Sequence, residues 1–163
     1  MHGGSFVNPQ PAIPQELERR RIVRLAFSAA HRVLDSPRCG LIHGHDFVVW
    51  AHLVPIEGIS ARVEADADFR QDAEIVLRRE LKSHLLLQQG DPLLNPLEEG
   101  ASARQEHCDR FRIKELDFAP TFEGLARHLF GLFGAPALAG GFYVVKVAVF
   151  NALDEGASFG FEP

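Results

Sequence analysis

The stretch "FSAAHRVLDSPRCGLIHGHDF", Phe27 to Phe47, contains the end of one predicted strand, a loop and the start of the next strand. The first strand, Arg21–Val33, partly alternates apolar with polar residues and is rich in β-branched side chains. The second strand, His45–Ile56, is interrupted at Pro55. Because only the loop around Asp35–Gly40 separates the two strands, we expect them to pair antiparallel.

Two later segments have the periodicity of amphipathic helices. In Asp68–Gln89 an apolar stripe is formed by Phe69, Ala73, Val76, Leu77, Leu81 and Leu85. The second helix is predicted within Ala119–Gly134, where Thr121 is the expected N-cap residue. Its apolar side is formed by Phe122, Leu125, Leu129 and Leu132.

Three further segments favour strands, namely Arg110–Phe118, Gly141–Leu153 and Ser158–Glu162. Arg110–Phe118 has the pattern of an edge strand, and Val145, Val147 and Val149 are predicted to share one face of Gly141–Leu153. The predicted order is strand, strand, helix, strand, helix, strand, strand. It favours an α+β domain in which helices cover one face of a sheet.

The composition is that of a soluble globular domain. The chain has 163 residues, of which 46% are hydrophobic and 24% charged, with a net charge of −5. The net negative charge argues against binding to nucleic acid, whose phosphates need a basic protein surface. No apolar run is long enough to span a membrane. Residues 1–19 are expected to be a flexible leader without a signal-peptide pattern, and residues 20–163 a single domain. Two cysteines do not form a disulfide framework, so a cytoplasmic location is expected.

His43 and His45 form an H-x-H pair at the start of a predicted strand. Side chains two positions apart on a strand point to the same side, so both imidazoles can face one point. His31, near the end of the preceding strand, is the best candidate for a third ligand. Three histidines with a fourth position open suit a catalytic zinc ion. The alternative is that these are ordinary polar residues, and the pattern by itself leaves both interpretations open.

Each cysteine has a structural and a chemical interpretation. Cys39 lies on the loop that leads into the H-x-H pair, where it is either a small buried residue or a thiolate base. Cys108 follows His107 within the polar segment Gly90–Asp109, but no second pair completes a structural zinc site. We therefore interpret Cys108 as an ordinary residue.

Taken together, these motifs resemble the 6-pyruvoyl-tetrahydropterin synthases and the related 6-carboxy-tetrahydropterin synthases of the queuosine pathway. The resemblance covers about residues 20–160 and follows the order of motifs in that family. The motifs are "FSAAH" (Phe27–His31), "CGLIHGHDF" (Cys39–Phe47), "DF" (Asp68–Phe69), "SHLLLQQGDPLL" (Ser83–Leu94), "PTFEGLA" (Pro120–Ala126) and the last long strand.

The resemblance implies the tunnelling fold, an antiparallel four-stranded sheet with two helices on one face. Subunits of this fold join their strands into a barrel-like ring, commonly a hexamer, with the active site at a subunit interface. Ring closure would also pair the edge strands.

The resemblance further implies a lyase that acts on 7,8-dihydroneopterin triphosphate with loss of triphosphate. In this interpretation His31, His43 and His45 match the zinc ligands. Cys39 matches the general base and His84 the histidine that relays protons, while Thr121 helps to line the pterin pocket.

Two positions depart from the family pattern. Ser83 stands where the family usually has an aspartate beside the relay histidine, and Asn151 stands where a glutamate grips the pterin. Asp154 or Glu155 is a candidate for the missing carboxylate. Three hypotheses follow: a pterin-forming lyase, a relative that acts on another pterin or related substrate, and a non-catalytic metal-binding oligomer.

Overall fold

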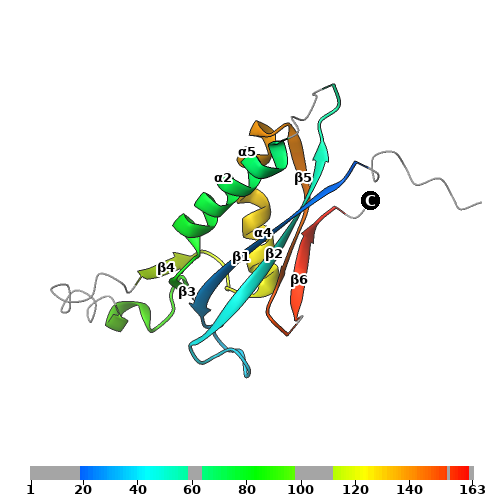
Figure 1. Ribbon diagram of the computed structural model, residues 1–163. Coiled ribbons are helices and arrows are strands. Elements are labelled where there is room, and N and C mark those ends of the chain that lie inside the picture. The colour runs from blue at the N-terminus through cyan, green and yellow to red at the C-terminus, as the bar shows by residue number, and fades with distance from the viewer. Residues whose placement is uncertain (1–18, 59–63, 98–111, 154, 162–163) are drawn as a thin grey trace, which may run out of the picture.

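The computed structural model describes residues 19–58, 64–97, 112–153 and 155–161. Within these residues six strands form one mixed sheet in the order β4-β3-β1-β2-β5-β6 (Figure 1). The strands are β1 (Arg21–His31), β2 (His43–Pro55), β3 (His84–Gln88), β4 (Arg112–Leu116), β5 (Phe142–Phe150) and β6 (Gly156–Gly160). The helices that cover one face of this sheet are α2 (Ala65–Glu80), α4 (Phe122–Leu132) and α5 (Gly134–Ala139).

The hairpin of β1 and β2 confirms the predicted antiparallel pairing. Its register runs from Arg21 opposite Leu53 to His31 opposite His43. The side chains that face the helices are buried and apolar along most of the hairpin, namely Val23, Leu25, Phe27, Ala29, Phe47, Val49, Ala51 and Leu53. Because side chains alternate between the two faces, the three histidines at the end of the hairpin extend this same apolar face.

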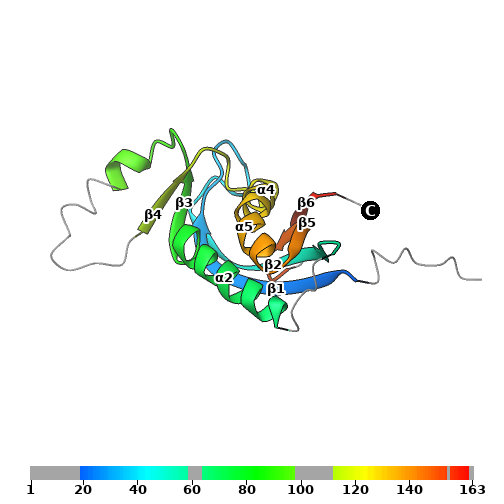
Figure 2. The same ribbon diagram turned by 90° about the horizontal axis from the view of Figure 1, so that it is seen from above.

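The predicted N-cap of the second helix is confirmed, because the Thr121 hydroxyl accepts a hydrogen bond from the Gly124 amide at 3.1 Å. Leu125 and Leu129 of this helix, α4, are fully buried. Figure 2 shows the sheet curling around α4 and α5. At the centre of the core, Phe69 of α2 meets Phe133 edge-to-face, with ring centroids 5.7 Å apart.

The first helix is shorter than predicted. The prediction of helix through Gln89 is wrong, because α2 ends at Glu80 and His84–Gln88 forms the strand β3. The C-cap residue Leu81 leaves the helical conformation with φ −132, and Ser83 then adopts φ +62, a left-handed backbone that lies between the helix and β3. The apolar run of β3 resembles the stripe of a helix because both faces of this strand are buried. Leu86 joins the main core on one face, and Leu85 and Leu87 pack with Leu94 on the other.

The predicted four-stranded sheet is also wrong in its strand count. The antiparallel strands β1, β2, β5 and β6 are extended by β3 and β4, which pair parallel beyond the end of β1. The edge position expected for the segment Arg110–Phe118 is confirmed by β4. The helix α5 was not predicted. The prediction that Val145 shares a face with Val147 and Val149 is wrong, because Val145 lies at a register shift in the pairing of β5 with β2, and only Val147 and Val149 belong to the buried core.

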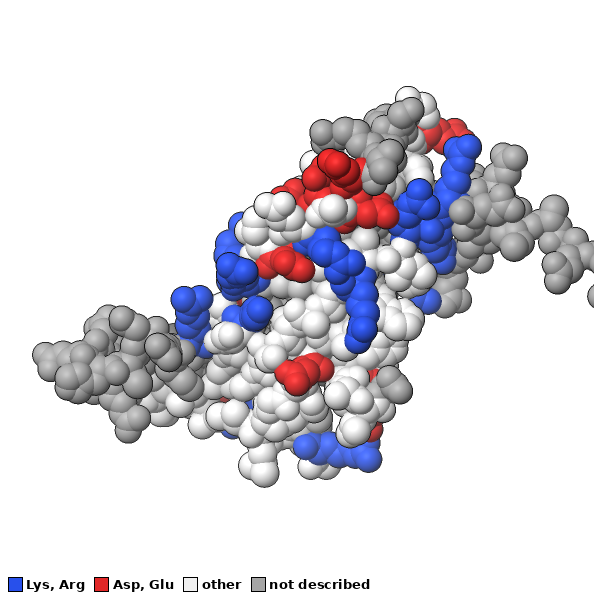
Figure 3. Space-filling model, viewed as in Figure 1, with Lys and Arg blue, Asp and Glu red and all other residues white. Residues whose placement is uncertain are grey.

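Charges of both signs are distributed over the surface shown in Figure 3. Acidic side chains gather over the first turn of α2 and basic ones over its last turn, an arrangement that complements the helix dipole. None of the described helices is both long and apolar enough to cross a membrane. The predicted leader up to residue 18 and the segment around Cys108 lie outside the described residues.

Candidate metal centre

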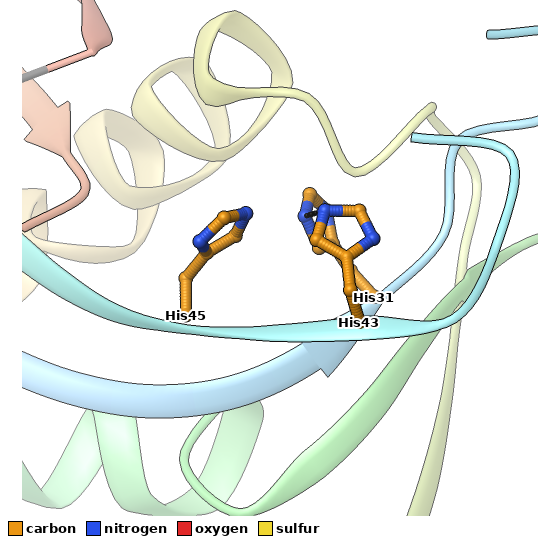
Figure 4. Close-up of side chains that lie close together, drawn as sticks. All are labelled: His31, His43 and His45. Carbon is orange, nitrogen blue, oxygen red and sulfur yellow. Dashed lines mark hydrogen bonds between the residues drawn. The ribbon is translucent and has the colours of Figure 1, made fainter. Parts of the chain in front are cut away.

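Three imidazoles meet at the end of the β1–β2 hairpin where the connecting loop joins the two strands. His31 comes from β1, His43 and His45 come from β2, and Figure 4 shows all three on the side of the sheet that faces α4. One ligand atom from each of the three lies within 4.8 Å of the others. Among the described residues, this is the one group of histidine, cysteine and acidic side chains arranged to share an ion.

Backbone carbonyls fix the tautomers of two of these rings. His31 Nδ1 is 2.7 Å from the Pro120 carbonyl oxygen, and His43 Nδ1 is 2.8 Å from that of Leu41. A carbonyl oxygen only accepts, so each Nδ1 carries a hydrogen and donates it. In a neutral ring the other nitrogen, Nε2, then presents a lone pair.

These two lone pairs face each other across 3.1 Å, the distance between His31 Nε2 and His43 Nε2. Two acceptors at this distance repel unless a proton or a cation lies between them. A tetrahedral ion with metal–nitrogen distances of about 2.0–2.1 Å holds its ligand atoms roughly 3.3 Å apart. Nδ1–H donation to a carbonyl is also the usual partner arrangement of a metal-ligating histidine. The residues present therefore fit a divalent metal ion.

The surroundings favour the neutral form of His31 and of His45. Burial lowers the pKa of His31 to about 4 against the opposing hydrogen bond to Pro120, and the neighbouring His43 and His45 lower it further. Burial also lowers the pKa of His45, as does His43, while the Glu155 carboxylate opposes this shift. Neutral imidazoles bind metal without first releasing a proton.

Two phenylalanine rings pack against one side of the cluster. The Phe47 ring centroid lies 5.7 Å from that of His31 and 5.5 Å from that of His45. The ring of Phe122, the first residue of α4, lies 6.1 Å from the ring of His45. These rings, together with the Pro120 carbonyl, were missed by sequence reasoning. A backbone acceptor leaves no mark in a residue pattern, and aromatic residues on a core face look like ordinary packing.

Cys39 lies on the β1–β2 loop, half-buried and with a free thiol. Its backbone is held at both ends: the Cys39 amide donates to Ser36 Oγ at 3.0 Å, and its carbonyl accepts from the Val33 amide at 2.8 Å. Its sulfur is not part of the metal-ligand group of the described residues. The loop thus holds a thiol beside the hairpin end that carries the histidines, without making it a ligand.

His84 begins β3 and does not join the three-histidine cluster. Its Nδ1 donates to the Lys82 carbonyl at 3.0 Å, which leaves Nε2 as the basic nitrogen. The residue lines an open hollow of about 510 Å³ together with Ser28, Asp46 and Arg112. Ser28 and Asp46 are neighbours across the hairpin on the face opposite the histidines, with the serine hydroxyl donating to the carboxylate at 2.5 Å.

Thr121 lines a second hollow, of about 720 Å³, between α4 and β6. Its hydroxyl is used as the helix N-cap, and Glu123, Arg127 and Phe159 line the same hollow. The Arg127 guanidinium lies over the Phe159 ring, 4.8 Å from its centroid. The hollow offers charged groups of both signs beside aromatic surface.

Asn151 is buried, with 4% of its surface exposed, at the turn between β5 and β6. Its Oδ1 accepts from the amides of Leu153 and Glu155 at 2.9 and 3.0 Å. Its Nδ2 donates to Glu155 Oε2 at 3.2 Å. The side chain predicted to contact substrate is therefore engaged within its own turn, whereas the Glu155 side chain is exposed.

Comparison with known proteins agrees with this architecture. Residues 22–161 match the family model described as 6-pyruvoyl tetrahydropterin synthase. A search of curated protein sequences found no match.

Several solved structures share the fold. An uncharacterized protein, WS1659, from Wolinella succinogenes superposes with a TM-score of 0.67 at 17% identity, over 88% of this chain and 98% of that one. Caenorhabditis elegans 6-pyruvoyl tetrahydropterin synthase gives a TM-score of 0.55 at 16% identity, over 88% and 95%. The Plasmodium vivax enzyme of the same name gives 0.58 at 11% identity, over 88% and 99%. At these identities the likeness shows the fold.

Proposed function

Because the chain belongs to the 6-pyruvoyl tetrahydropterin synthase family, we propose that it is a zinc-dependent lyase that removes triphosphate from 7,8-dihydroneopterin triphosphate. The observation that carries the proposal is the pair of opposed Nε2 lone pairs of His31 and His43, with His45 beside them. Three neutral nitrogen ligands on rigid strands are the donor set of a catalytic zinc ion with an open position.

The proposed chemistry divides the residues by role. Zinc held by His31, His43 and His45 would supply Lewis acidity, which polarises a side-chain oxygen of the substrate and acidifies the adjacent C–H bonds. Cys39, as a thiolate, takes a proton from that side chain, and His84 returns one through its basic Nε2. Phe47 and Phe122 keep water away from the reacting end of the substrate.

The pterin ring is proposed to bind beside α4. Thr121 and the hollow that it lines supply polar groups and the aromatic surface of Phe159 for a flat bicyclic ring. Asn151 and Glu155, at the β5–β6 turn, belong to the same substrate-binding end of the domain in this proposal.

We also propose that the enzyme works as a homo-oligomer, a hexamer in the family pattern. Within the described residues, β1 pairs with β3 only at Ala30 and His31, and the Ser28 carbonyl accepts from the Ser83 amide, so the edge from Arg21 to Phe27 has no partner strand on that side. β6 forms the opposite edge of the sheet. Joining these two edges between copies would satisfy the hydrogen-bonding groups of both. The half-buried free thiol of Cys39 suits a reducing cytoplasm.

The direct test is to incubate the zinc-loaded protein with 7,8-dihydroneopterin triphosphate and to measure triphosphate release. We expect release that depends on Cys39, with a Cys39→Ala variant that still binds one zinc per chain but turns over at least about 100-fold more slowly. Release at the same rate in both proteins would exclude the proposed base, and no release from the wild type would exclude the reaction.

A second candidate function is favoured by the two departures at Ser83 and Asn151. Neither supplies the carboxylate that the family pattern places there, and the Asn151 side chain is occupied in its turn. A relative that acts on another pterin or related substrate would bind pterins, detected by quenching of their fluorescence, without releasing triphosphate. A non-catalytic metal-binding oligomer would bind zinc and no pterin.

A further inference from the structure

The face of the sheet that the helices do not cover, here called the outer face, carries a group of basic side chains (Figure 2). His52 of β2 pairs with Lys146 of β5. Their neighbours Ala51 and Val147 belong to the buried core on the helix side. Because side chains alternate along a strand, His52 and Lys146 therefore point to the outer face.

Arg20 brings a third basic group to the same place. It directly precedes β1, and the first residue of that strand, Arg21, pairs with Leu53 of β2. Burial is the largest cause that lowers the pKa of His52, and the positive charges of Arg20 and Lys146 lower it further. Both of these charges are close enough to act on the imidazole, so the electrostatic potential at this point favours an anion.

Two nitrogen atoms of this group lack a hydrogen-bond partner. Arg20 Nε and His52 Nδ1 are both buried and bond to no atom of the described residues. An arginine Nε always carries a hydrogen, and a ring nitrogen of histidine donates when it is protonated. Buried donors are paired in the great majority of proteins, so these two nitrogens are groups that a bound acceptor can satisfy.

The three side chains are nevertheless within reach of a ligand. Arg20, His52 and Lys146 are each half-buried, with part of the side chain open to solvent. Their groups differ in shape: a planar guanidinium that binds through two N–H groups, a compact ammonium and an imidazole. Together they can surround an anion that has several acceptor oxygens.

We propose that Arg20, His52 and Lys146 form a binding site for a phosphoryl group on the outer face of the sheet. A phosphoryl group carries a charge close to −2 and several strong acceptor oxygens, which match three basic groups better than a single carboxylate does.

The site is separate from the metal centre. His52 and His43 are nine positions apart on β2, which corresponds to about 30 Å at the rise of a strand. The imidazole of His43 lies on the side of the sheet that faces α4, opposite to the outer face. The proposed anion site therefore does not depend on the proposed reaction.

Trp50 provides a readout beside this site. It is the only tryptophan of the chain, and it lies two positions from His52 on the same face of β2, with 42% of its surface exposed. Its ring meets that of Phe150 at 5.6 Å between centroids, and both rings line a small hollow of about 150 Å³ with Arg24. A charge bound at His52 should change the environment of this indole and hence its fluorescence.

The test titrates the zinc-loaded protein with inorganic phosphate, while sodium chloride keeps the ionic strength constant. We expect a saturable change in Trp50 fluorescence and, as a second measurement, a melting temperature that rises with the phosphate concentration. Ribose 5-phosphate, titrated in the same way, distinguishes a phosphate ester from a free phosphate ion as the preferred ligand.

Arg20→Gln should weaken phosphate binding by about 10- to 100-fold, because it removes a charged donor and keeps a polar side chain. Arg20→Lys keeps the charge and should retain part of the affinity. Arg78→Gln removes the same charge from the exposed side of α2, on the other side of the sheet, and is the matched control that should bind like the wild type.

A zinc ion with an open position is a second place where phosphate binds in proteins, and His43→Ala separates the two sites. We expect its phosphate affinity to match that of the wild type, whatever its zinc content. Loss of binding in His43→Ala, with binding retained in Arg20→Gln, would locate the anion at the metal centre and overturn the proposal.

The other outcomes are equally decisive. A response to chloride alone that equals the response to phosphate would show a general effect of charge, without a site. Unchanged phosphate affinity in Arg20→Gln would remove Arg20 from the site. Absence of saturation in both the fluorescence and the melting temperature of the wild type would overturn the proposal and leave the proposed reaction untouched.

Discussion

His31 and His43 stand directly opposite each other in the β1–β2 register, with their Nε2 atoms 3.1 Å apart. Carbonyl acceptors, Pro120 for His31 and Leu41 for His43, hold both rings with their lone pairs turned inward. The pairing of two strands is therefore sufficient to bring together two of the three proposed metal ligands. His45 joins them because it is two positions from His43 on the same face.

Removal of one ligand should abolish metal binding. We expect His43→Ala to lower zinc affinity by more than about 100-fold, since losing even an outer hydrogen-bond partner of a ligand costs 10- to 100-fold. The control is His52→Ala on the same strand, where the side chain is remote from the cluster. The measurement is the zinc content of each variant after dialysis. Full zinc retention in His43→Ala would show that the ligands are wrongly assigned.

The metal-free protein should lose stability in mild acid. The pKa of His31 is about 4 in the folded chain and near 6.5 in the unfolded chain, so between these values only the unfolded state binds the proton. With respect to this group, the free energy of unfolding should be constant above pH 6.5, fall by about 3 kcal/mol in total between pH 6.5 and 4, and level off below pH 4. Urea denaturation in the presence of a chelator measures this dependence.

The control for this pH dependence is His31→Gln, which cannot titrate. We expect a lower free energy of unfolding at neutral pH but a shallower fall between pH 6.5 and 4. The free energy of unfolding of the variant should still depend on pH to some extent, because burial also lowers the pKa values of His45, His52 and His128. An unchanged slope in the variant would show that His31 is not the main group responsible.

Ser83 can be tested with two substitutions that separate backbone strain from chemistry. Its φ of +62 favours glycine and, to a smaller degree, aspartate. Ser83→Gly should therefore raise the free energy of unfolding by up to about 1 kcal/mol without raising turnover. Ser83→Asp adds a carboxylate next to His84 and should raise the rate of triphosphate release several-fold. Equal rates in the two variants would argue against a role for a carboxylate at this position.

Two glycines of α4 should respond in opposite directions to alanine. A Cβ at Gly124 would lie 2.4 Å from the Ala119 carbonyl oxygen and 2.7 Å from the Phe118 ring. A Cβ at Gly131 would have no atom of the described residues within 4 Å beyond its own helix backbone and its chain neighbours. We expect Gly124→Ala to destabilise the protein by about 1–3 kcal/mol and Gly131→Ala to stabilise it by about 0.5 kcal/mol. Thermal unfolding measures both, and a stabilised Gly124→Ala would mean that the segment before α4 is free to move.

The sequence was sufficient for the local features of this protein. It predicted the β1–β2 hairpin, the N-cap Thr121 and the three histidines on one face. Each depends on neighbours that are close along the chain: alternation in a strand, a hydroxyl before a helix, or a short loop that forces antiparallel pairing. The match of the chain to its family agrees with that part of the interpretation.

The sequence could not show where β3 belongs. Its apolar residues fit the stripe of a helix, and only packing on both faces of the sheet selects a strand. The same holds for Asn151, which the family pattern suggested as a substrate contact. Whether an amide is available to a ligand depends on hydrogen bonds to residues that its own letter does not specify.

The sequence by itself therefore determined which side chains form the candidate metal centre, because strand periodicity and one short loop set their positions. The tertiary structure decided how these side chains are oriented and which polar groups remain available. The Pro120 carbonyl fixes the tautomer of His31 from 89 positions away, and the turn of Asn151 leaves Glu155 as the exposed carboxylate. The physical reason is that lone pairs and protons are directed by backbone groups brought close only by folding.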